Sequence, residues 1–432
     1  MLQGLRDRFF GQSLLSRVLL LTSSTIVAQL LVILAMPIIS RLFPPAELGQ
    51  VALVTVFINA IQTVICLRYN SALPLAERPM DAARMVWVSL AGGIVGSLFF
   101  YGIFLILLKA EWLGFDILPD WSHWIILICM PGLIGFTLGQ SWWLRRRNAG
   151  MVGASLIARA GAQNGTRIAA GAAGAGLPGL MLAEIAMTWS SVYMLIKMPW
   201  RRIRGGLKSA RRLWQQACRW WRFPLIEGPS AALNSLAVFL PVPLAAALYG
   251  AEVAGWFMIA FRVGSIPIGQ IGRALSHATY MDFAEAIRQQ DPVRARRLFY
   301  RVIKRLALLA VIPMGLFAAL GPVLAGPVLG SGWAESGVFL ALMVPWLYAQ
   351  LVISPVSRLM SVLQRQDLKL IFDAAALVAI FLAWLGATVL DLAPRDFILL
   401  LSGLLAVAYG VYFFVIRYAL NSYIEARTPD AV

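Results

Sequence analysis

Several ionisable side chains stand alone within long apolar stretches, and Arg262 is the clearest of them. Arg262 lies in the segment FMIAFRVGSIPIG, five residues before Pro267. If this segment crosses a membrane, a charge at its centre is costly and indicates a function. An arginine that faces a cavity could bind an anion, whereas an arginine paired with an acid such as Glu227 would be structural. The sequence leaves both interpretations open, and the first makes Arg262 the main candidate anion ligand.

A second group of polar side chains repeats along one helical face. Arg159, Gln163 and Arg167 are spaced four residues apart, and Asn164 lies next to Gln163. Residues four apart share one face of a helix, so this polar stripe should face protein or water and not lipid. Arg159 and Arg167 are therefore candidate anion ligands. The alternative is a packing interface rich in small residues, which the glycines that follow favour.

Other polar residues in apolar stretches complete a predicted cavity lining. Glu227 and Asn234 are seven residues apart and share a helical face. Glu184 and Asp373 are the lone acids of their apolar stretches, and each is either an acid for cation coupling or a satisfied structural acid. We consider Glu227 and Asp373 as the acids that could couple to H⁺ or Na⁺. Arginine suits phosphate, and amides suit sugar hydroxyls. The remaining candidates are two arginines at span ends, Arg17 and Arg68, as anion ligands, and four amides, Gln29, Asn59, Gln62 and Asn234, as sugar contacts.

The composition indicates that these residues belong to a membrane protein. Of the 432 residues, 60% are hydrophobic and 13% are charged, against about 45–50% and about 25% in soluble domains. A spanning helix needs about 20 mostly apolar residues, and the alternation typical of barrel strands is absent from the sequence. We therefore expect an all-α protein with about twelve spans, at Val18–Ile39, Leu48–Leu67, Met85–Leu108, Trp124–Leu144, Met151–Ala172, Gly179–Met198, Pro224–Tyr249, Val253–Gly272, Leu306–Leu324, Val338–Val356, Leu370–Leu390 and Ile398–Ile416.

Positive charge is distributed unevenly among the segments that connect the spans. The formal net charge is +17, from 37 Lys and Arg against 20 Asp and Glu. With the N-terminus inside, 31 of the 37 cations fall on inner segments and three on outer ones, namely Arg41, Lys109 and Arg395. Cytoplasmic loops are enriched in Lys and Arg. We expect a multi-pass membrane protein with both termini in the cytoplasm and no nucleic-acid partner.

Two similar halves flank a basic segment. The first span leads into MPIISRLFPPAELGQVAL and the seventh into LPVPLAAALYGAEVAGWFM, so Glu47 and Glu252 open the next helices, 205 residues apart. This agreement is either a coincidence of common turn chemistry or the mark of a duplicated six-helix unit, with parallel repeats around a central cavity. We expect an N-terminal six-helix lobe at 1–198, a basic cytoplasmic linker at 199–222 and a C-terminal six-helix lobe at 223–432.

Motifs for other kinds of chemistry are missing from the sequence. It contains no GxxxxGK[ST] loop, no metal-ligand cluster and no recognisable catalytic triad, so we expect no cofactor, no metal and no enzymatic activity. The aromatic and basic segment RRLWQQACRWWRFP could be interpreted as a nucleic-acid site. On a chain this apolar, we expect it to lie at an anionic membrane surface.

The motifs of the two halves together resemble a known family. The first half contributes MPIISRLFPPAELGQVAL and LRYNSALPLAE, and the second contributes WRFPLIEGPSAALNSLAVFLPVPLAAALYG, GWFMIAFRVGSIPIGQ and VLGSGWAESGVFLALMVP. In this order, and over most of the chain, they are similar to polysaccharide transporters, the Wzx-type oligosaccharide flippases of the multidrug/oligosaccharidyl-lipid/polysaccharide exporter superfamily. Asn70 departs from the family pattern, in which many members have an acid after Arg-Tyr.

The resemblance implies a two-lobed bundle that moves undecaprenyl-diphosphate-linked oligosaccharide across the inner membrane by alternating access. The family's arginine midway along span eight corresponds to Arg262, and its arginines at the inner ends of spans one and two correspond to Arg17 and Arg68. The implied partners are this lipid-linked substrate, membrane lipids, and assembly proteins such as a polymerase and a chain-length regulator.

Two alternative functions stay open. A drug/cation antiporter of the same superfamily would favour cavities dominated by acids. A membrane polysaccharide polymerase or ligase would be expected to carry a large outer catalytic loop, and the longest predicted outer loop, Lys109–His123, is too short to hold one.

Overall fold

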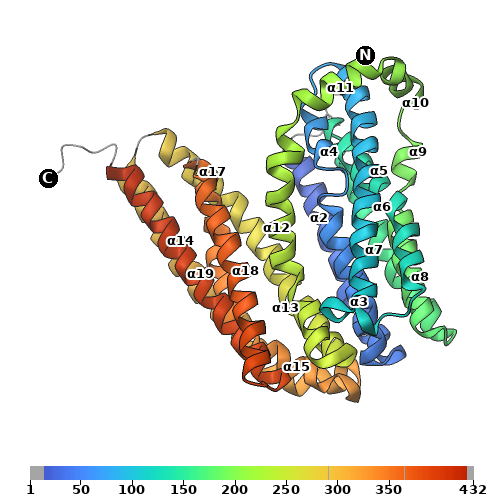
Figure 1. The fold of residues 1–432 in the computed structure, drawn as a ribbon. Helices are drawn as coiled ribbons and strands as arrows, with labels where there is room; N and C mark the ends of the chain where they lie inside the picture. Colours follow the sequence, from blue (N-terminus) through green and yellow to red (C-terminus); the bar gives the residue numbers. More distant parts are fainter. Residues whose placement is uncertain (1–13, 290, 364, 426–432) are drawn as a thin grey trace, which may run out of the picture. The chain divides into compact units, whose positions relative to one another are not determined.

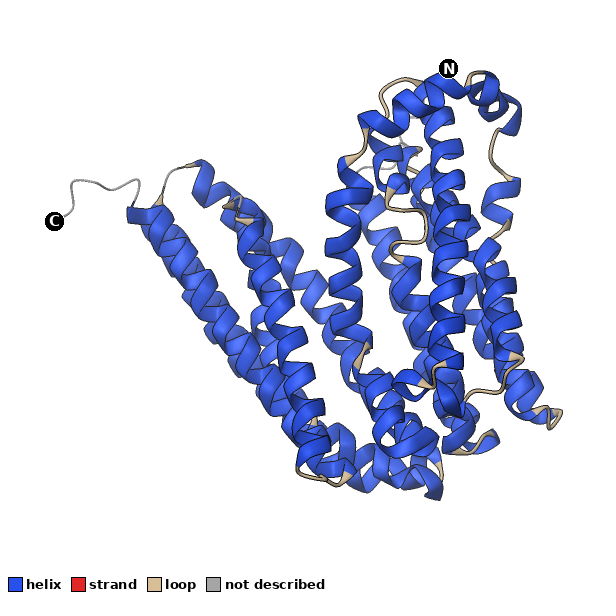
Figure 2. Cartoon of the chain, in the orientation of Figure 1, coloured by secondary structure: helices blue, strands red, loops and turns tan. Residues whose placement is uncertain are grey.

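A computed structural model of the chain describes residues 14–289, 291–363 and 365–425 (Figure 1). Within these ranges the ordered elements are helices, joined by turns, and no strand occurs (Figure 2). By internal contacts the chain divides into two compact units, Met1–Ser235 and Leu236–Val432.

The first unit is built around long helices that cross it from end to end. Its described elements are α2 (Leu14–Leu42), α3 (Pro45–Gln62), α4 (Tyr69–Ala72), η1 (Leu73–Leu75), α5 (Pro79–Lys109), η2 (Trp112–Ile117), α6 (Ser122–Arg145), α7 (Ala149–Ala172), α8 (Gly176–Trp189), α9 (Tyr193–Ile196), α10 (Trp200–Ile203), η3 (Arg204–Lys208), α11 (Ala210–Arg219), the π-helical turn η4 (Phe223–Glu227), and α12 (Gly228–Phe239), which runs on into the second unit.

The second unit continues with longer helices. Its elements are α13 (Pro241–Arg288), α14 (Pro292–Leu329), η5 (Ser331–Trp333), α15 (Ala334–Leu342), α16 (Val344–Ile353), η6 (Ser354–Arg358), α17 (Leu359–Val362), α18 (Gln366–Val389) and α19 (Pro394–Glu425). Gly250, with φ 83° and ψ −175°, interrupts α13 with a backbone conformation that L residues rarely adopt. The helix then continues to Arg288, 16 residues beyond the predicted end of span eight at Gly272.

Prolines and capping side chains in the local sequence determine where several helices begin. Proline at the first helical turn needs no hydrogen-bond acceptor for its nitrogen, and Pro45 opens α3 in this way. The Asn148 side chain caps α7 by accepting a hydrogen bond from the Met151 amide at 3.0 Å. Asp291 caps α14 in the same manner, with its carboxylate 2.8 Å from the Arg294 amide. Such caps satisfy amides that have no partner inside the helix.

The described helices account for the predicted spans. Eight helical stretches are long and apolar enough to cross a membrane, or nine if the pair Ser331–Leu342 and Val344–Arg358, bent by 49°, forms one span. The stretch Phe223–Gly272 has 50 residues and turns at Gly250, so it contains two of the predicted spans. α3 and α7, of 18 and 24 residues, occupy the places of spans two and five. The expected all-α, polytopic fold is confirmed; the repeat and the cavity between lobes stay predictions.

Small residues let neighbouring helices approach closely, as is common in membranes. A Cβ added to Gly96 of α5 would lie only 2.1 Å from the carbonyl oxygen of Ile65. In the second unit, a Cβ on Gly337 of α15 would lie 2.0 Å from the carbonyl oxygen of Gly321 in α14. Neither contact leaves room for a side chain, so these glycines let each helix approach the neighbouring backbone closely.

The basic segment expected as a linker packs on the first unit. Ile203 of α10 is fully buried, and its carbonyl oxygen accepts a hydrogen bond from Trp87 Nε1 at 2.9 Å. On α11, the Gln216 side chain donates to Asp81 Oδ1 at 3.1 Å, while Trp214 is exposed. Internal contacts therefore divide the chain after Ser235, whereas the predicted bounds at 198 and 223 followed the order of the spans. Membrane-surface binding by this segment stays a prediction.

Candidate functional site

A buried carboxylate lies at the centre of the first unit, and three donors converge on it. Glu184 Oε1 accepts hydrogen bonds from Arg167 Nη2 at 2.6 Å, Gln163 Nε2 at 2.8 Å and Thr55 Oγ1 at 3.0 Å. We call these four residues the Glu184 cluster. The Arg167 and Glu184 side chains are only 4% and 0% exposed. Glu184 is thus paired with Arg167, as expected of a satisfied structural acid.

The polar stripe of α7 brings these donors together. Arg167 and Gln163 both reach Glu184 of α8, which confirms that their four-residue spacing puts them on one inward face. On the helix side that meets α2, a Cβ on Gly153 would lie 2.2 Å from Ser24 Oγ. α7 therefore combines both predicted features, a small-residue contact with α2 and a polar face turned into protein.

Arg159 lies one turn before Gln163 and is held by two other helices. Its Nη2 donates to Gln62 Oε1 of α3 at 2.6 Å, and its guanidinium carbon lies 4.1 Å from the centre of the Phe136 ring of α6. This distance is within the range of a cation–π contact. Gln62, expected to contact sugar, therefore serves as an acceptor for Arg159.

The polar groups around Glu184 retain unused hydrogen-bonding capacity. Arg159 Nη1, Arg167 Nε and Glu184 Oε2 are buried without a hydrogen-bond partner. Two arginines and one carboxylate give this buried region an excess of one positive charge. The arrangement fixes three helices to one another through polar contacts, and charge of this sign favours anions over cations nearby.

A second ion pair involves Arg68, which lies between α3 and α4. Arg68, at a turn residue with φ 60°, pairs with Glu227 of η4, and the two side chains are 24% and 42% exposed. Next to this pair, the hydroxyls of Thr63 and Ser235 lie 2.9 Å apart. Glu227, expected as a coupling acid or a structural partner, thus pairs with Arg68. Because the pair is partly exposed, its contribution to stability is small.

Arg262 lies half-buried on α13, at a point where this helix packs tightly on α16. The neighbouring Phe261 stacks on Trp346 of α16, with ring centroids 5.5 Å apart. One turn further, a Cβ on Gly264 would lie 2.6 Å from a methyl carbon of Leu347. These contacts give the Arg262 backbone a fixed position within the second unit.

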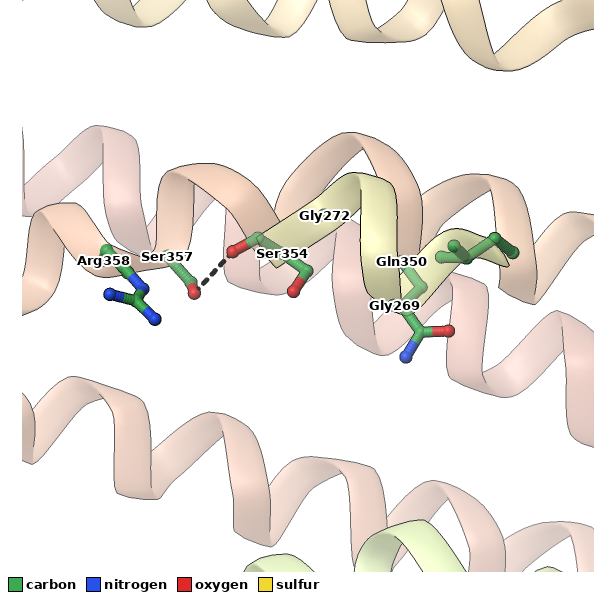
Figure 3. Close-up of a pocket in the computed structure, with 7 residues that line it drawn as sticks. Gly269, Gly272, Gln350, Ser354, Ser357 and Arg358 are labelled. Carbon is green, nitrogen blue, oxygen red and sulfur yellow. Dashed lines mark hydrogen bonds between the residues drawn. The ribbon is translucent and has the colours of Figure 1, made fainter. Parts of the chain in front are cut away.

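A small cavity opens further along the same helix pair, and its polar lining was missed by the sequence analysis. It has a volume of about 280 Å³. Four polar residues from α16 and η6 line one side, at positions whose spacing of four, three and one residues corresponds to one helical face. We call this cavity the hydroxyl pocket; its lining residues are Ile268, Gly269, Gly272, Gln350, Ser354, Ser357 and Arg358 (Figure 3).

Arg262 and one wall of the hydroxyl pocket lie on the same helix, α13. Gly269 follows Arg262 by seven residues, which places the two positions on nearly the same face of the helix, about 10.5 Å apart along its axis. None of the seven lining residues is acidic. The second unit therefore presents arginine, hydroxyl and amide groups along α13 and α16, a combination that suits anionic and polyhydroxylated ligands.

The remaining candidate residues occupy separate places. Asp373 of α18 is buried, beside Phe372, which stacks on Tyr412 of α19 at 4.2 Å between ring centroids. Gln29 and Asn59 are half-buried, and Asn234 is exposed. The Arg17 side chain lies outside the described side chains. Among the described residues, no group of three or more His, Cys, Asp or Glu side chains could hold a metal ion.

Solved structures that are similar to this chain include transporters. An inward-facing multidrug resistance MATE transporter of the MOP superfamily matches with a TM-score of 0.74 at 17% identity, covering 94% of this chain and 100% of that one. A MOP superfamily transporter from Pyrococcus furiosus, whose binding pocket is described as having reverse polarity, matches with a TM-score of 0.58 at 15% identity, covering 94% and 96%. These likenesses show the fold.

The amino-acid sequence shows the family to which the chain belongs. A family model for polysaccharide biosynthesis proteins matches residues 38–338, which is more than half of the chain. The chain therefore belongs to the polysaccharide biosynthesis protein family and is a multi-pass membrane protein with the fold of MOP superfamily transporters. A search of curated proteins by sequence finds no significant match. Glu184 and Arg262 lie within the matched range, whereas Gln350 and Arg358 follow it.

Proposed function

We propose that the protein is a flippase that moves polyprenyl-diphosphate-linked oligosaccharide, the precursor of an O-antigen, capsule or exopolysaccharide, across the bacterial inner membrane by alternating access. One observation carries this proposal: a family model for polysaccharide biosynthesis matches a chain that has the fold of membrane transporters. A transporter in polysaccharide synthesis must move a saccharide across the bilayer, and the lipid anchor can stay in the hydrocarbon while the headgroup crosses.

The charges inside the two units support an anionic headgroup as the cargo. In the first unit, the buried Glu184 is paired with Arg167, and Arg159 adds a further positive charge. In the second unit, Arg262 and Arg358 lie along the helices that form the hydroxyl pocket. Arginine binds phosphate oxygens through two parallel hydrogen bonds, whereas an antiporter of cationic drugs would need acids without such partners.

We assign roles to the candidate residues on this basis. Arg262 is the principal ligand of the diphosphate, helped by Arg17 and Arg68. Arg159 and Arg167 act from inside the first unit, by their positive charge and by fixing α7 against α3 and α8. The amides of Gln29, Asn59 and Asn234 contact sugar, and Gln62 acts through Arg159.

The energy source and the partners are part of the same proposal. We propose that a proton or Na⁺ gradient drives transport, with Asp373 and Glu227 as the acids that could bind the ion. The protein needs no other cofactor, and both of its termini lie in the cytoplasm. A polymerase and a chain-length regulator would receive the translocated oligosaccharide on the outer side.

Deletion of the gene tests the function in cells. We expect lipid-linked oligosaccharide to accumulate on the cytoplasmic face and surface polysaccharide to disappear, because synthesis continues while export stops. The measurement is the amount of lipid-linked oligosaccharide extracted from the deletion strain and from a strain that carries the gene on a plasmid. Unchanged polysaccharide combined with increased sensitivity to cationic drugs would support the antiporter instead.

A further inference from the structure

The hydroxyl pocket of the second unit has no role in the assignments above, although its shape and chemistry are specific. One wall comes from α13, where Gly269 and Gly272 leave the backbone bare. A Cβ added to Gly272 would meet no atom within 4 Å. The glycine is therefore not required for helix packing, and its missing side chain keeps the pocket open.

The pocket offers hydrogen-bond acceptors from Ser357 and Gln350. The Ser357 hydroxyl donates its proton to the Ser354 carbonyl oxygen at 2.7 Å (Figure 3). Its oxygen lies within hydrogen-bonding reach of Tyr412 of α19 and has a further lone pair that can accept. Gln350 Oε1 is buried and makes no hydrogen bond of its own, while the Gln350 side chain lies within hydrogen-bonding reach of Tyr409 of α19. A buried acceptor without a donor is costly, so a ligand that supplies hydroxyl protons would be favoured. Phosphate oxygens, which accept hydrogen bonds, would not satisfy these groups.

At Arg358 the pocket offers hydrogen-bond donors and a positive charge instead of acceptors. Arg358 is exposed and lies at one end of the polar row, with Gln350 at the other end and the two serines between them (Figure 3). A guanidinium only donates hydrogen bonds and carries a fixed positive charge, which suits an anion. The pocket thus combines a site for an anion with a site for hydroxyl donors.

The size of the pocket limits what can enter. At about 280 Å³, it lies just below the range of about 300–1,000 Å³ usual for small-molecule sites. One sugar ring fits such a volume, whereas an oligosaccharide does not. The ligand that matches both ends is a single sugar ring joined directly to a phosphate.

We propose that the hydroxyl pocket binds the sugar ring nearest the lipid diphosphate, with Gln350 and Ser357 accepting hydrogen bonds from its hydroxyls and Arg358 binding the adjacent phosphate, at a stage of transport separate from diphosphate binding by Arg262. This proposal rests on the proposed function, because it takes the lipid-linked saccharide as the cargo. It makes the pocket a selection point that distinguishes a lipid carrying sugar from the bare lipid diphosphate.

Binding to the purified full chain in lipid nanodiscs tests the proposal with two probes, polyprenyl diphosphate and polyprenyl diphosphate linked to N-acetylglucosamine. The wild type should bind the sugar-linked probe about tenfold more tightly, as expected for two additional hydrogen bonds. Gly272→Leu, which fills the pocket, should remove this preference without changing the affinity for the bare lipid. The matched control is Gly403→Leu in α19, where an added Cβ also meets no atom within 4 Å.

Two more variants separate the ends of the pocket. Gln350→Leu has nearly the same volume and should remove the preference even if Gly272→Leu does not fold. Arg358→Ala should weaken binding of both probes by a similar factor, because both carry the diphosphate.

Contrary results would identify which proposal fails. If the wild type prefers the sugar-linked probe, but Gly272→Leu and Gln350→Leu keep that preference, the pocket proposal is wrong and the flippase proposal stands. Full binding of the bare lipid by Arg358→Ala would overturn the phosphate contact. If the wild type binds neither probe, the proposed function fails together with the pocket.

Discussion

Glu184→Ala is expected to lower the free energy of unfolding by about 3–5 kcal/mol, because it leaves the charge of Arg167 buried without a counter-charge. The Arg167 and Glu184 side chains are 4% and 0% exposed, and their charged atoms lie 2.6 Å apart. The same substitution removes the acceptor of Gln163 and Thr55, which lie on two other helices. Thermal unfolding of the purified protein in detergent measures the loss as a lower Tm.

Two further variants make this test specific to the buried pair. In the double variant Glu184→Leu with Arg167→Met, both charges are gone, and most of the lost stability should return, since apolar pairs often replace buried ion pairs without cost. Glu335→Ala is the matched surface control, because Glu335 pairs with the exposed Arg395; its Tm should hardly change. An equal Tm for Glu184→Ala and Glu335→Ala would contradict the structural role of the Glu184 cluster.

Arg262→Ala is expected to reduce transport about 100-fold or more, while the protein stays folded. Hydrogen bonds to charged groups contribute about 1.5–3 kcal/mol each, and a bidentate contact with phosphate contains two of them. The backbone at this position is fixed by the neighbouring Phe261–Trp346 stack, which the substitution does not touch. Cells with this variant should accumulate lipid-linked oligosaccharide on the cytoplasmic face and lose surface polysaccharide.

Two control variants test whether the effect depends on the guanidinium group and on its position in the second unit. Arg262→Lys keeps the charge but loses the planar guanidinium, so transport should be intermediate. Arg395→Ala removes an exposed arginine of the same unit and should leave surface polysaccharide unchanged. Normal surface polysaccharide in the Arg262→Ala strain, with the protein present in the membrane, would remove Arg262 from the site.

The helices could be predicted from the sequence because lipid imposes length and apolarity on each span. The limits of prediction appear at α13, where the predicted span ends at Gly272 but the helix continues to Arg288. Hydropathy marks the apolar part of a helix, and a helix can continue into polar sequence where no cap or proline ends it. Likewise, the basic segment around Ile203 packs on the first unit through contacts that its composition does not reveal.

Only part of the candidate site could be predicted from the sequence. The four-residue spacing of Arg159, Gln163 and Arg167 correctly predicted one polar face, since periodicity is a local property. The partner of that face, Glu184, lies on another helix and looked like a lone acid, because pairing depends on how helices pack. The polar row from Gln350 to Arg358 carried a helical period that could have been noticed, but its bare wall on α13 becomes evident only from the packing of the two helices.

The most direct test of the central claim is translocation by the purified protein in proteoliposomes. Fluorescent undecaprenyl-diphosphate-linked oligosaccharide is placed in one leaflet, and an impermeant reagent that modifies sugar reports how much reaches the other leaflet over time. The account predicts that liposomes with the wild-type protein exchange the lipid much faster than empty liposomes, and that liposomes with Arg262→Ala behave like empty ones. An oligosaccharide that stays in its original leaflet while a cationic dye is exported would contradict the account.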